Sequence, residues 1–310
     1  MTILSRCLVT GGNGFVGAAL LHRMVSQGQR PAVLLRQGSN TARIDDIIDQ
    51  LHVIRADLAD LGQARAEIQA YGPDSVAHLA WSGVAGADRN EPRQTDNLAY
   101  SLDLYRLARD IGVKSFIGLG SQAEYGPCPA IIDESVPCQP TTLYGAAKLS
   151  CFLLLQRLAA LDGLRFVWLR LFSSYGPGDD PRWLISYLIG KLMAGGRPSL
   201  TACEQRWDYI HVDDAAAAVA AAIVGSASGV YNLGSGEARP LREIVSLVRD
   251  EIDPSLPLGF GEVPYRDDQV MHLQADIGAL SEAFGWRPHL TLEQGIRDTV
   301  AWHKNHINAV

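Results

Sequence analysis

The fold of this 310-residue chain is indicated most clearly by residues 6–17, Arg6-Cys7-Leu8-Val9-Thr10-Gly11-Gly12-Asn13-Gly14-Phe15-Val16-Gly17. Its first five residues predict a short buried strand, and the apolar periodicity of residues 18–27 predicts a helix. Between them, Gly11 allows a tight turn, Gly14 lets backbone approach a ligand, and Gly17 lets helix and strand pack closely. The first N–H groups of the helix then face a pyrophosphate. This order predicts a dinucleotide site with cofactor contacts at Gly11, Gly14, Phe15, Val16 and Gly17.

The end of the second predicted strand, residues 31–35, indicates which dinucleotide binds. An NAD site of this kind usually carries an acidic residue there for the ribose 2′-hydroxyl. This chain has Arg36 instead, with Arg43 further on. A guanidinium fork fits a 2′-phosphate, so we expect NADP(H). NAD(H) remains the alternative, because Arg36 is also consistent with a solvent-exposed residue at the end of a strand that makes no contact with the cofactor.

Further strand–helix units predict a doubly wound parallel α/β sheet, whose ligands bind at the carboxyl ends of the strands. Strands are expected over 52–55, 75–79 and 114–119, with helices over 60–71 and 92–111. Asp57, after the third strand, could accept a hydrogen bond from an adenine amino group. His78, inside the fourth strand, is expected to be a satisfied core histidine. At these strand ends we expect cofactor contacts from Asp57, Leu58, Leu79 and Ala80.

A tyrosine and a lysine lie four residues apart at the start of a predicted helix over 143–161. Tyr144 and Lys148 would share one helix face. A phenol has a reference pKa of roughly 10, and a neighbouring ammonium lowers that pKa. The pair suits proton transfer to or from an alcohol or carbonyl oxygen, and Ser121, after the fifth strand, could hold the same oxygen. Tyr144 and Lys148 would also be consistent with an ordinary surface pair, and Ser121 with a serine that caps a helix or lies in a turn.

After the sixth predicted strand, residues 165–171, the regular alternation stops. Helices are expected over 181–194, 240–250 and 292–305, with a strand over 207–211. Asp213 and Asp214 are expected to cap an alanine-rich helix that reaches residue 224. We therefore expect a dinucleotide-binding domain over residues 1–172, to which segments near 206–235 return. Residues 173–310 would form a smaller, discontinuous C-terminal α/β lobe that mainly binds substrate.

Composition narrows the class of protein. The net charge of -7 argues against a general nucleic-acid or membrane-surface binder, and 47% apolar residues allow a sizeable core. The apolar stretch at Ile3-Leu4 is too short for a secretory signal. Five scattered cysteines show no C-x-x-C and no Cys/His metal spacing, which favours free thiols in a reducing cytosol. We expect a cytoplasmic protein without a metal.

Several motifs occur in one order along the chain: the glycine turn, Ser121, Tyr144 with Lys148, and then residues 175–178, 211–214 and 231–236. Together they resemble the extended short-chain dehydrogenase/reductase family, in its nucleotide-sugar branch, over essentially the whole chain. The resemblance implies a Rossmann sheet that binds NAD(P), a second lobe that binds a nucleoside-diphosphate sugar, and a homodimer formed by the two long helices. It also implies that Tyr144 is the acid/base, that Lys148 orients the nicotinamide ribose, and that Ser121 holds the substrate oxygen.

Departures from the family pattern narrow the reaction. Sugar 4,6-dehydratases carry an Asp-Glu pair directly after the catalytic serine or threonine, whereas this chain has Gln122-Ala123, with Glu124 displaced by one residue. We therefore reject a dehydratase. Many epimerases have asparagine at the position of Ser173. At the position where the family commonly has a basic residue, this chain has Trp207, and Arg206 lies one residue before it. By resemblance, substrate contacts are expected from Ser82, Gln122, Ser173, Arg206 and Arg266. Arg266 also fits a surface arginine paired with Asp267 or Asp268.

Net reduction is the predicted reaction, because a reductase consumes a pool cofactor, typically NADPH, whereas a 4-epimerase returns its hydride to the sugar. Arg36 therefore favours NADPH-dependent reduction of the 4-keto group of a nucleoside-diphosphate-4-keto-6-deoxyhexose. An NAD(P)-dependent nucleotide-sugar 4-epimerase is the alternative. A non-enzymatic dinucleotide-sensing regulator is a third reading, disfavoured because Ser121, Tyr144 and Lys148 are all retained.

Overall fold

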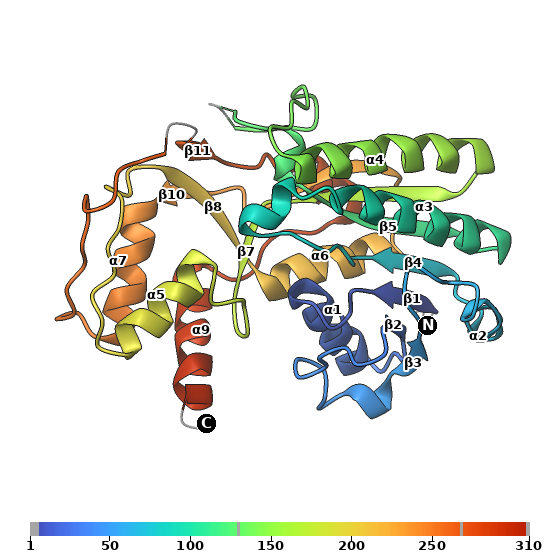
Figure 1. The fold of residues 1–310 in the computed structure, drawn as a ribbon, viewed down its shortest axis with the longest axis horizontal. Helices are drawn as coiled ribbons and strands as arrows, with labels where there is room; N and C mark the ends of the chain where they lie inside the picture. The colour runs from blue at the N-terminus through green and yellow to red at the C-terminus, as the bar shows by residue number, and fades with distance from the viewer. Residues whose placement is uncertain (1–5, 129–130, 267–268, 308–310) are drawn as a thin grey trace.

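The structure is a computed structural model that describes residues 6–128, 131–266 and 269–307 (Figure 1). Its centre is a seven-stranded sheet in the order β3-β2-β1-β4-β5-β6-β9. Every neighbouring pair in this sheet is parallel. The strands are β1 (Cys7–Thr10), β2 (Ala32–Leu35), β3 (His52–Arg55), β4 (Ser75–His78), β5 (Ser115–Ser121), β6 (Arg165–Leu171) and β9 (Gly229–Leu233). The predicted doubly wound sheet is confirmed.

Helices cover both faces of this sheet, which explains why its strands are almost continuously apolar. On one face lie α1 (Phe15–Ser26) and α6 (Val212–Val224). On the other face lie α2 (Arg65–Tyr71), α3 (Gln94–Asp110) and α4 (Leu143–Asp162) (Figure 1). Each layer has its own buried core, and the α3–α4 side holds an aromatic cluster made of Tyr105, Phe116, Phe152, Phe166 and Trp168.

A second, smaller sheet lies beside the large one, at the left of Figure 1. Its strands are β7 (Ser173–Tyr175), β8 (Arg206–His211), β10 (Ala238–Pro240) and β11 (His272–Leu273). Helices α5 (Leu184–Met193), α7 (Leu241–Ile252) and α9 (Leu292–Ile307) pack with it, while α8 (Gly278–Phe284) packs against β9 and α6. The expected smaller C-terminal α/β lobe is confirmed. The division into domains at residue 172 stays a prediction.

Two predicted helix starts are corrected by local hydrogen bonds. The helix expected from residue 181 begins at Leu184, because the Asp180 carboxylate accepts the backbone N–H of Arg182 at 2.9 Å and holds a turn there. The expected cap of α6 by its two aspartates is wrong. His211 is the N-cap, and the Asp214 carboxylate instead accepts the N–H groups of residues 289 and 290 at 3.0 Å. Asp214 therefore ties α6 to the segment before α9.

His78 is a core histidine, as expected. Its two ring nitrogens lie 2.7 Å from the Thr10 hydroxyl and 2.8 Å from the Ser101 hydroxyl. Burial lowers the pKa of His78 to about 3. The ring therefore stays neutral and links β1, β4 and α3.

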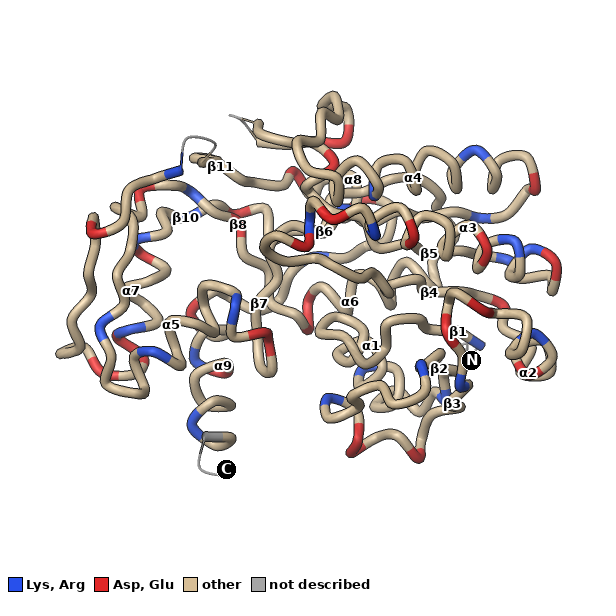
Figure 2. Tube along the Cα trace, in the orientation of Figure 1, with Lys and Arg blue, Asp and Glu red and all other residues tan. Residues whose placement is uncertain are grey.

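Acidic and basic side chains are interspersed along the chain (Figure 2). Over the ranges that the structure describes, none of the helices combines the length and the apolar character that a membrane span requires.

Candidate active site

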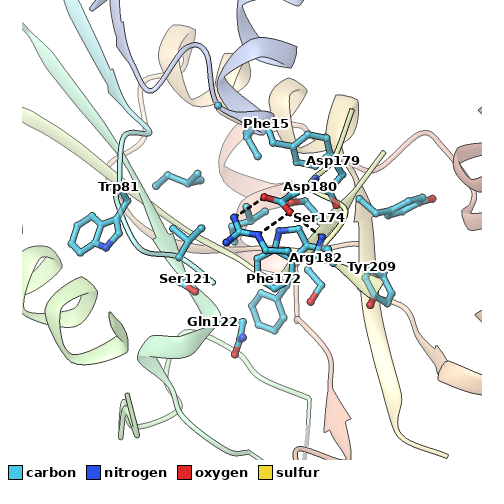
Figure 3. A pocket seen from close by; sticks show the side chains of 18 of the residues that line it. Phe15, Trp81, Ser121, Gln122, Phe172, Ser174, Asp179, Asp180, Arg182 and Tyr209 are labelled. Carbon is cyan, nitrogen blue, oxygen red and sulfur yellow. Dashed lines mark hydrogen bonds and ion pairs between the residues drawn. The ribbon is translucent and has the colours of Figure 1, made fainter. Parts of the chain in front are cut away.

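A cavity of about 590 Å³ opens at the carboxyl ends of the central strands, between the large sheet and the smaller lobe. One wall consists of the glycine turn after β1, Ser121 at the end of β5, and Tyr144 and Lys148 on α4. Residues 173–185 and the start of the smaller sheet supply the other wall. Figure 3 shows Trp81 and Ser121 on one side of the cavity and Tyr209 on the other. The cavity therefore joins the predicted cofactor loop to the predicted substrate lobe.

The glycine turn has the close packing that its sequence predicts. Gly11 has a φ of +71°, and a Cβ there would lie 2.6 Å from the backbone nitrogen of Ala80. A Cβ on Gly17 would overlap the carbonyl oxygen of Gly11. The turn thus lies directly on the end of β4, with Gly14 as the N-cap of α1. The predicted contacts that line the cavity are Gly11, Gly14, Phe15, Val16, Gly17 and Leu79, whereas Ala80 lies behind Gly11.

Ser121 has a double role. It is the last residue of β5, two residues beyond the predicted end of that strand, and its side chain lines the cavity. It is also the N-cap of the short helix η3 (Gln122–Glu124). The Ser121 hydroxyl accepts the N–H of Ala123 at 3.2 Å, and the Glu124 carboxylate accepts the N–H of Ser121 at 2.9 Å. This reciprocal cap fixes the serine at the edge of the cavity.

Tyr144 and Lys148 lie in the first turns of α4, which Thr142 caps by accepting the N–H of Gly145 at 3.1 Å. Both side chains are buried and line the cavity. The Lys148 ammonium donates to the Leu119 carbonyl oxygen at 2.6 Å and lies 3.8 Å from the centre of the Trp81 ring. Burial lowers the pKa of Lys148 to about 8. The structure therefore brings the three expected residues into one cavity.

The expected lowering of the tyrosine pKa by Lys148 is not found. Burial raises the pKa of Tyr144, and the opposing effects come from Ser121 and from the positive charge of Arg89. The Arg89 guanidinium carbon lies 4.9 Å from the centre of the Tyr144 ring. Its buried Nε has no hydrogen-bond partner within the described residues, and its side chain lines the cavity. No sequence signal marks Arg89, which lies in η2 (Gly86–Asn90), a short 3₁₀ helix.

Of the five expected substrate contacts, Gln122 and Ser173 line the cavity and the others do not. The backbone of Ser82 is turned toward α3, where its N–H donates to Asn97 at 2.9 Å. Arg206 is exposed and donates to the Ala238 carbonyl at 2.6 Å. Arg266 lies outside the lining, and Asp267 and Asp268, its alternative partners, lie outside the described residues.

Strand alternation explains the position of Arg206. Successive side chains on a strand point to opposite faces, and Gln205, Trp207 and Tyr209 line the cavity. Arg206 therefore faces away from it. The Trp207 indole donates to the Ser173 hydroxyl at 2.7 Å. Ser173 and Trp207, the two residues that depart from the family pattern, thus contact each other and connect β7 to β8.

A polar wall that the sequence did not indicate follows β7. Burial raises the pKa of Asp179 to about 7, and one of its carboxylate oxygens is buried without a hydrogen-bond partner within the described residues. Asp180 pairs with Arg182 at 2.6 Å (Figure 3). Asp179, Asp180 and Arg182 all line the cavity. Their positions are set by a loop without periodicity, so the sequence alone could not place them.

Glu124, the displaced acid, is not in this cavity. It is completely buried behind Ser121 and pairs with Arg170 at 2.8 Å. The Trp168 indole also donates to its carboxylate, at 3.0 Å. Beside Ser121 the cavity has the amide of Gln122 instead of a carboxyl group.

A second cavity, of about 490 Å³, lies at the ends of β2 and β3. Residues 36–39 and 55–57 line it together with Gln63, so the predicted contacts Arg36 and Asp57 meet there and Leu58 does not. Arg43 is directed elsewhere: its guanidinium donates to the Gly178 carbonyl oxygen at 2.9 and 3.0 Å. Together the two cavities offer room and polar groups for a dinucleotide lying across the ends of the sheet.

Comparison with known proteins gives a family match and similar proteins along the whole chain. The family described as "NAD dependent epimerase/dehydratase family" matches residues 7–234. A UDP-glucose 4-epimerase of Corynebacterium glutamicum is 27% identical over 96% of this chain and 94% of its own length. A dTDP-glucose 4,6-dehydratase of Salmonella typhimurium is 25% identical over 96% of this chain and 92% of its own length.

Among solved structures, a UDP-N-acetylglucosamine 4-epimerase from Methanobrevibacter ruminantium, in complex with UDP-N-acetylmuramic acid, superimposes with a TM-score of 0.90. The two chains are 25% identical, and the match covers 97% of this chain and 99% of that one.

Proposed function

The chain belongs to the NAD dependent epimerase/dehydratase family, and we propose that it is an NADPH-dependent reductase of a nucleoside-diphosphate-4-keto-6-deoxyhexose. Its membership of the extended short-chain dehydrogenase/reductases makes it an NAD(P)-dependent, oxidoreductase-like enzyme. The relatives act on nucleotide sugars, which supports the substrate class. The observation that supports net reduction best is Arg36, which lines the second cavity and follows the end of β2, the position at which an NAD site usually has an acidic residue.

The residues present fit a dinucleotide. Because Gly11 and Gly17 lack a Cβ, the turn packs closely onto the backbone at residues 11–12 and 79–80, and the cavity continues from this turn to Tyr144 and Lys148. In the proposal, the glycine turn holds the pyrophosphate, Lys148 holds the nicotinamide ribose, and Arg36 and Asp57 hold the adenosine end. When bound, the reduced nicotinamide supplies the hydride.

The protein's own contribution is to hold the sugar and to supply a proton. Tyr144 donates its phenolic proton to the C4 oxygen of the sugar as that oxygen gains negative charge. The phenol is protonated at neutral pH, and because its pKa is raised it gives up this proton only to a strong base such as the emerging alkoxide. Ser121 donates a hydrogen bond to the same oxygen, and the positive charges of Lys148 and Arg89 stabilise it.

A dehydratase would need a further acid and base beside the sugar. Gln122 and Ala123 occupy those positions, and Glu124 is held behind Ser121 by its ion pair with Arg170. A 4-epimerase is the second candidate, supported by relatives with that name and by the same Ser121–Tyr144 pair. A non-enzymatic sensor of the dinucleotide is the least supported reading, since it would have no use for the retained pair.

A cofactor-consumption assay distinguishes these reactions. Mixed with NADPH and a series of nucleotide-linked 4-keto-6-deoxyhexoses, the protein should lower the absorbance of the reduced nicotinamide in proportion to the sugar consumed. NADH should support a slower reaction, because Arg36 then has no phosphate to bind. Interconversion of two 4-hydroxy sugars, with no net consumption of either cofactor, would instead identify an epimerase.

The protein is also proposed to be a homodimer that associates through α3 and α4. These helices pack together, and α4 exposes Leu153 and Leu161, which are 53% and 70% accessible. An exposed apolar stripe on a helix pair fits a second copy of the same surface.

Replacing Leu161 by Asp should shift the protein from dimer to monomer in light scattering after gel filtration. The control is Val224→Asp at the end of α6, where a 61% exposed apolar residue lies away from this helix pair. A monomeric unmodified protein would exclude the proposed dimer.

A further inference from the structure

The second cavity contains a second basic residue, Arg55, in addition to Arg36. Arg55 is the last residue of β3, and β3 pairs in parallel with β2 so that Leu35 lies opposite Arg55. Arg36 follows Leu35 directly. The backbones of the two arginines are therefore close, and both residues line the cavity of about 490 Å³.

Contacts within the cavity hold Arg55 close to the turn after β2. Its guanidinium donates to the carbonyl oxygen of Arg36 at 3.4 Å. That turn is closed by a hydrogen bond from the N–H of Ser39 to the same carbonyl oxygen at 3.2 Å, with Gly38 at a φ of +71°. The guanidinium of Arg55 is thus kept beside the residue that is proposed to bind the 2′-phosphate.

The charges around the two guanidinium groups favour an anionic ligand. Over the ranges that the structure describes, no carboxylate forms an ion pair with Arg36 or Arg55, although the chain has a net charge of -7. The acid that lines the cavity, Asp57, uses one carboxylate oxygen to accept the N–H of Ala59 at 3.0 Å. The two guanidinium groups thus outnumber the one carboxylate that lines the cavity, and a phosphate dianion would offset the repulsion between the two positive charges.

We infer that Arg55 is a second phosphate-binding residue, which together with Arg36 selects a cofactor carrying a 2′-phosphate. The inference rests on the proposed preference for NADPH. A phosphate monoester offers three oxygens, enough to accept hydrogen bonds from two guanidinium forks at once. A ribose 2′-hydroxyl offers one oxygen, and it leaves the repulsion between the two arginines in place. Arg55 therefore contributes to the affinity for NADPH and little to the affinity for NADH.

The test compares Arg55→Gln with Arg36→Gln, and with Arg30→Gln as a matched control. Arg30 is an exposed arginine just before β2, at the opposite end of that strand. Dissociation constants for NADPH and NADH are measured by nicotinamide fluorescence, without any sugar substrate. Calorimetry with 2′,5′-ADP and 5′-AMP isolates the 2′-phosphate from the rest of the cofactor, and thermal melting checks the fold.

Arg55→Gln should weaken binding of NADPH and of 2′,5′-ADP by about 10- to 100-fold, with little change for NADH and 5′-AMP. Arg30→Gln should change none of them. If Arg55→Gln behaves like Arg30→Gln while Arg36→Gln weakens NADPH, the role of Arg55 is wrong and the NADPH preference stands. An equal loss of affinity for NADPH and NADH in Arg55→Gln also overturns the proposed role of Arg55. If the unmodified protein binds NADH as tightly as NADPH, the proposed cofactor preference itself fails.

Discussion

Replacing Tyr144 by Phe should lower kcat for reduction of the 4-keto sugar by about 10²- to 10⁴-fold, the usual contribution of a positioned proton donor. The substitution removes one oxygen and keeps the ring, which packs edge-on against Trp81 with centroids 6.2 Å apart. The Arg89 guanidinium also lies on this ring. Cofactor affinity and melting temperature should therefore change little, so that the loss appears in turnover.

A matched substitution separates the role of this phenol from a general effect of removing a hydroxyl group. Tyr187, on α5, is 41% exposed, and Tyr187→Phe should leave turnover unchanged. Rates are measured with NADPH and the sugar both saturating, and NADPH binding is measured separately by fluorescence. Full turnover in Tyr144→Phe would show that another group donates the proton. If the unmodified protein turns over no sugar at all, the sensor reading gains support.

Replacing Arg170 by Met should lower the free energy of unfolding by about 3–5 kcal/mol, because it leaves a buried carboxylate without its counter-ion. The side chains of Arg170 and Glu124 are 3% and 0% exposed, and they lie 2.8 Å apart. Glu124 also accepts the N–H of Ser121, so the carboxylate supports the edge of the active site. Urea denaturation gives the change in unfolding free energy.

Two comparisons make this prediction specific. Arg106 pairs with Asp103 on the surface, where the side chains are 59% and 56% exposed, so Arg106→Met should cost no more than about 1 kcal/mol. Adding Glu124→Gln to Arg170→Met removes the stranded charge and keeps an oxygen for the Ser121 N–H. The double variant should therefore be more stable than Arg170→Met. Similar losses for Arg170→Met and Arg106→Met would contradict the structural role given to the buried pair.

The sequence predicts the sheet and its catalytic candidates because each depends on a local pattern. The glycine turn, the strand end at Ser121 and the spacing of Tyr144 and Lys148 are all short-range signals. A parallel sheet then gathers strand ends on one edge, which is why these residues meet in one cavity. The strands β7, β10 and β11 escaped prediction because two or three residues are too few to show alternation.

Residues positioned by tertiary contacts could not be found in this way. Arg89 lies in a short 3₁₀ helix and Asp179 in an irregular segment, and their proximity to the active site depends on how the lobes pack. Arg206 could have been excluded, because strand alternation turns it away once Trp207 is placed in the cavity. The raised pKa of Tyr144 was also unpredictable, since it results from burial that outweighs the nearby charges.

Transfer of deuterium from the cofactor to the sugar distinguishes net reduction from epimerisation. NADPH deuterated at C4 of the nicotinamide is incubated with a nucleotide-linked 4-keto-6-deoxyhexose, and the sugar product is analysed by mass spectrometry and NMR. We predict one deuterium at C4 of the sugar for each NADPH oxidised, and loss of this transfer in Tyr144→Phe. Unchanged 4-keto sugar and unoxidised NADPH, together with interconversion of a nucleotide-linked 4-hydroxy sugar and its C4 epimer without gain of deuterium, would contradict net reduction.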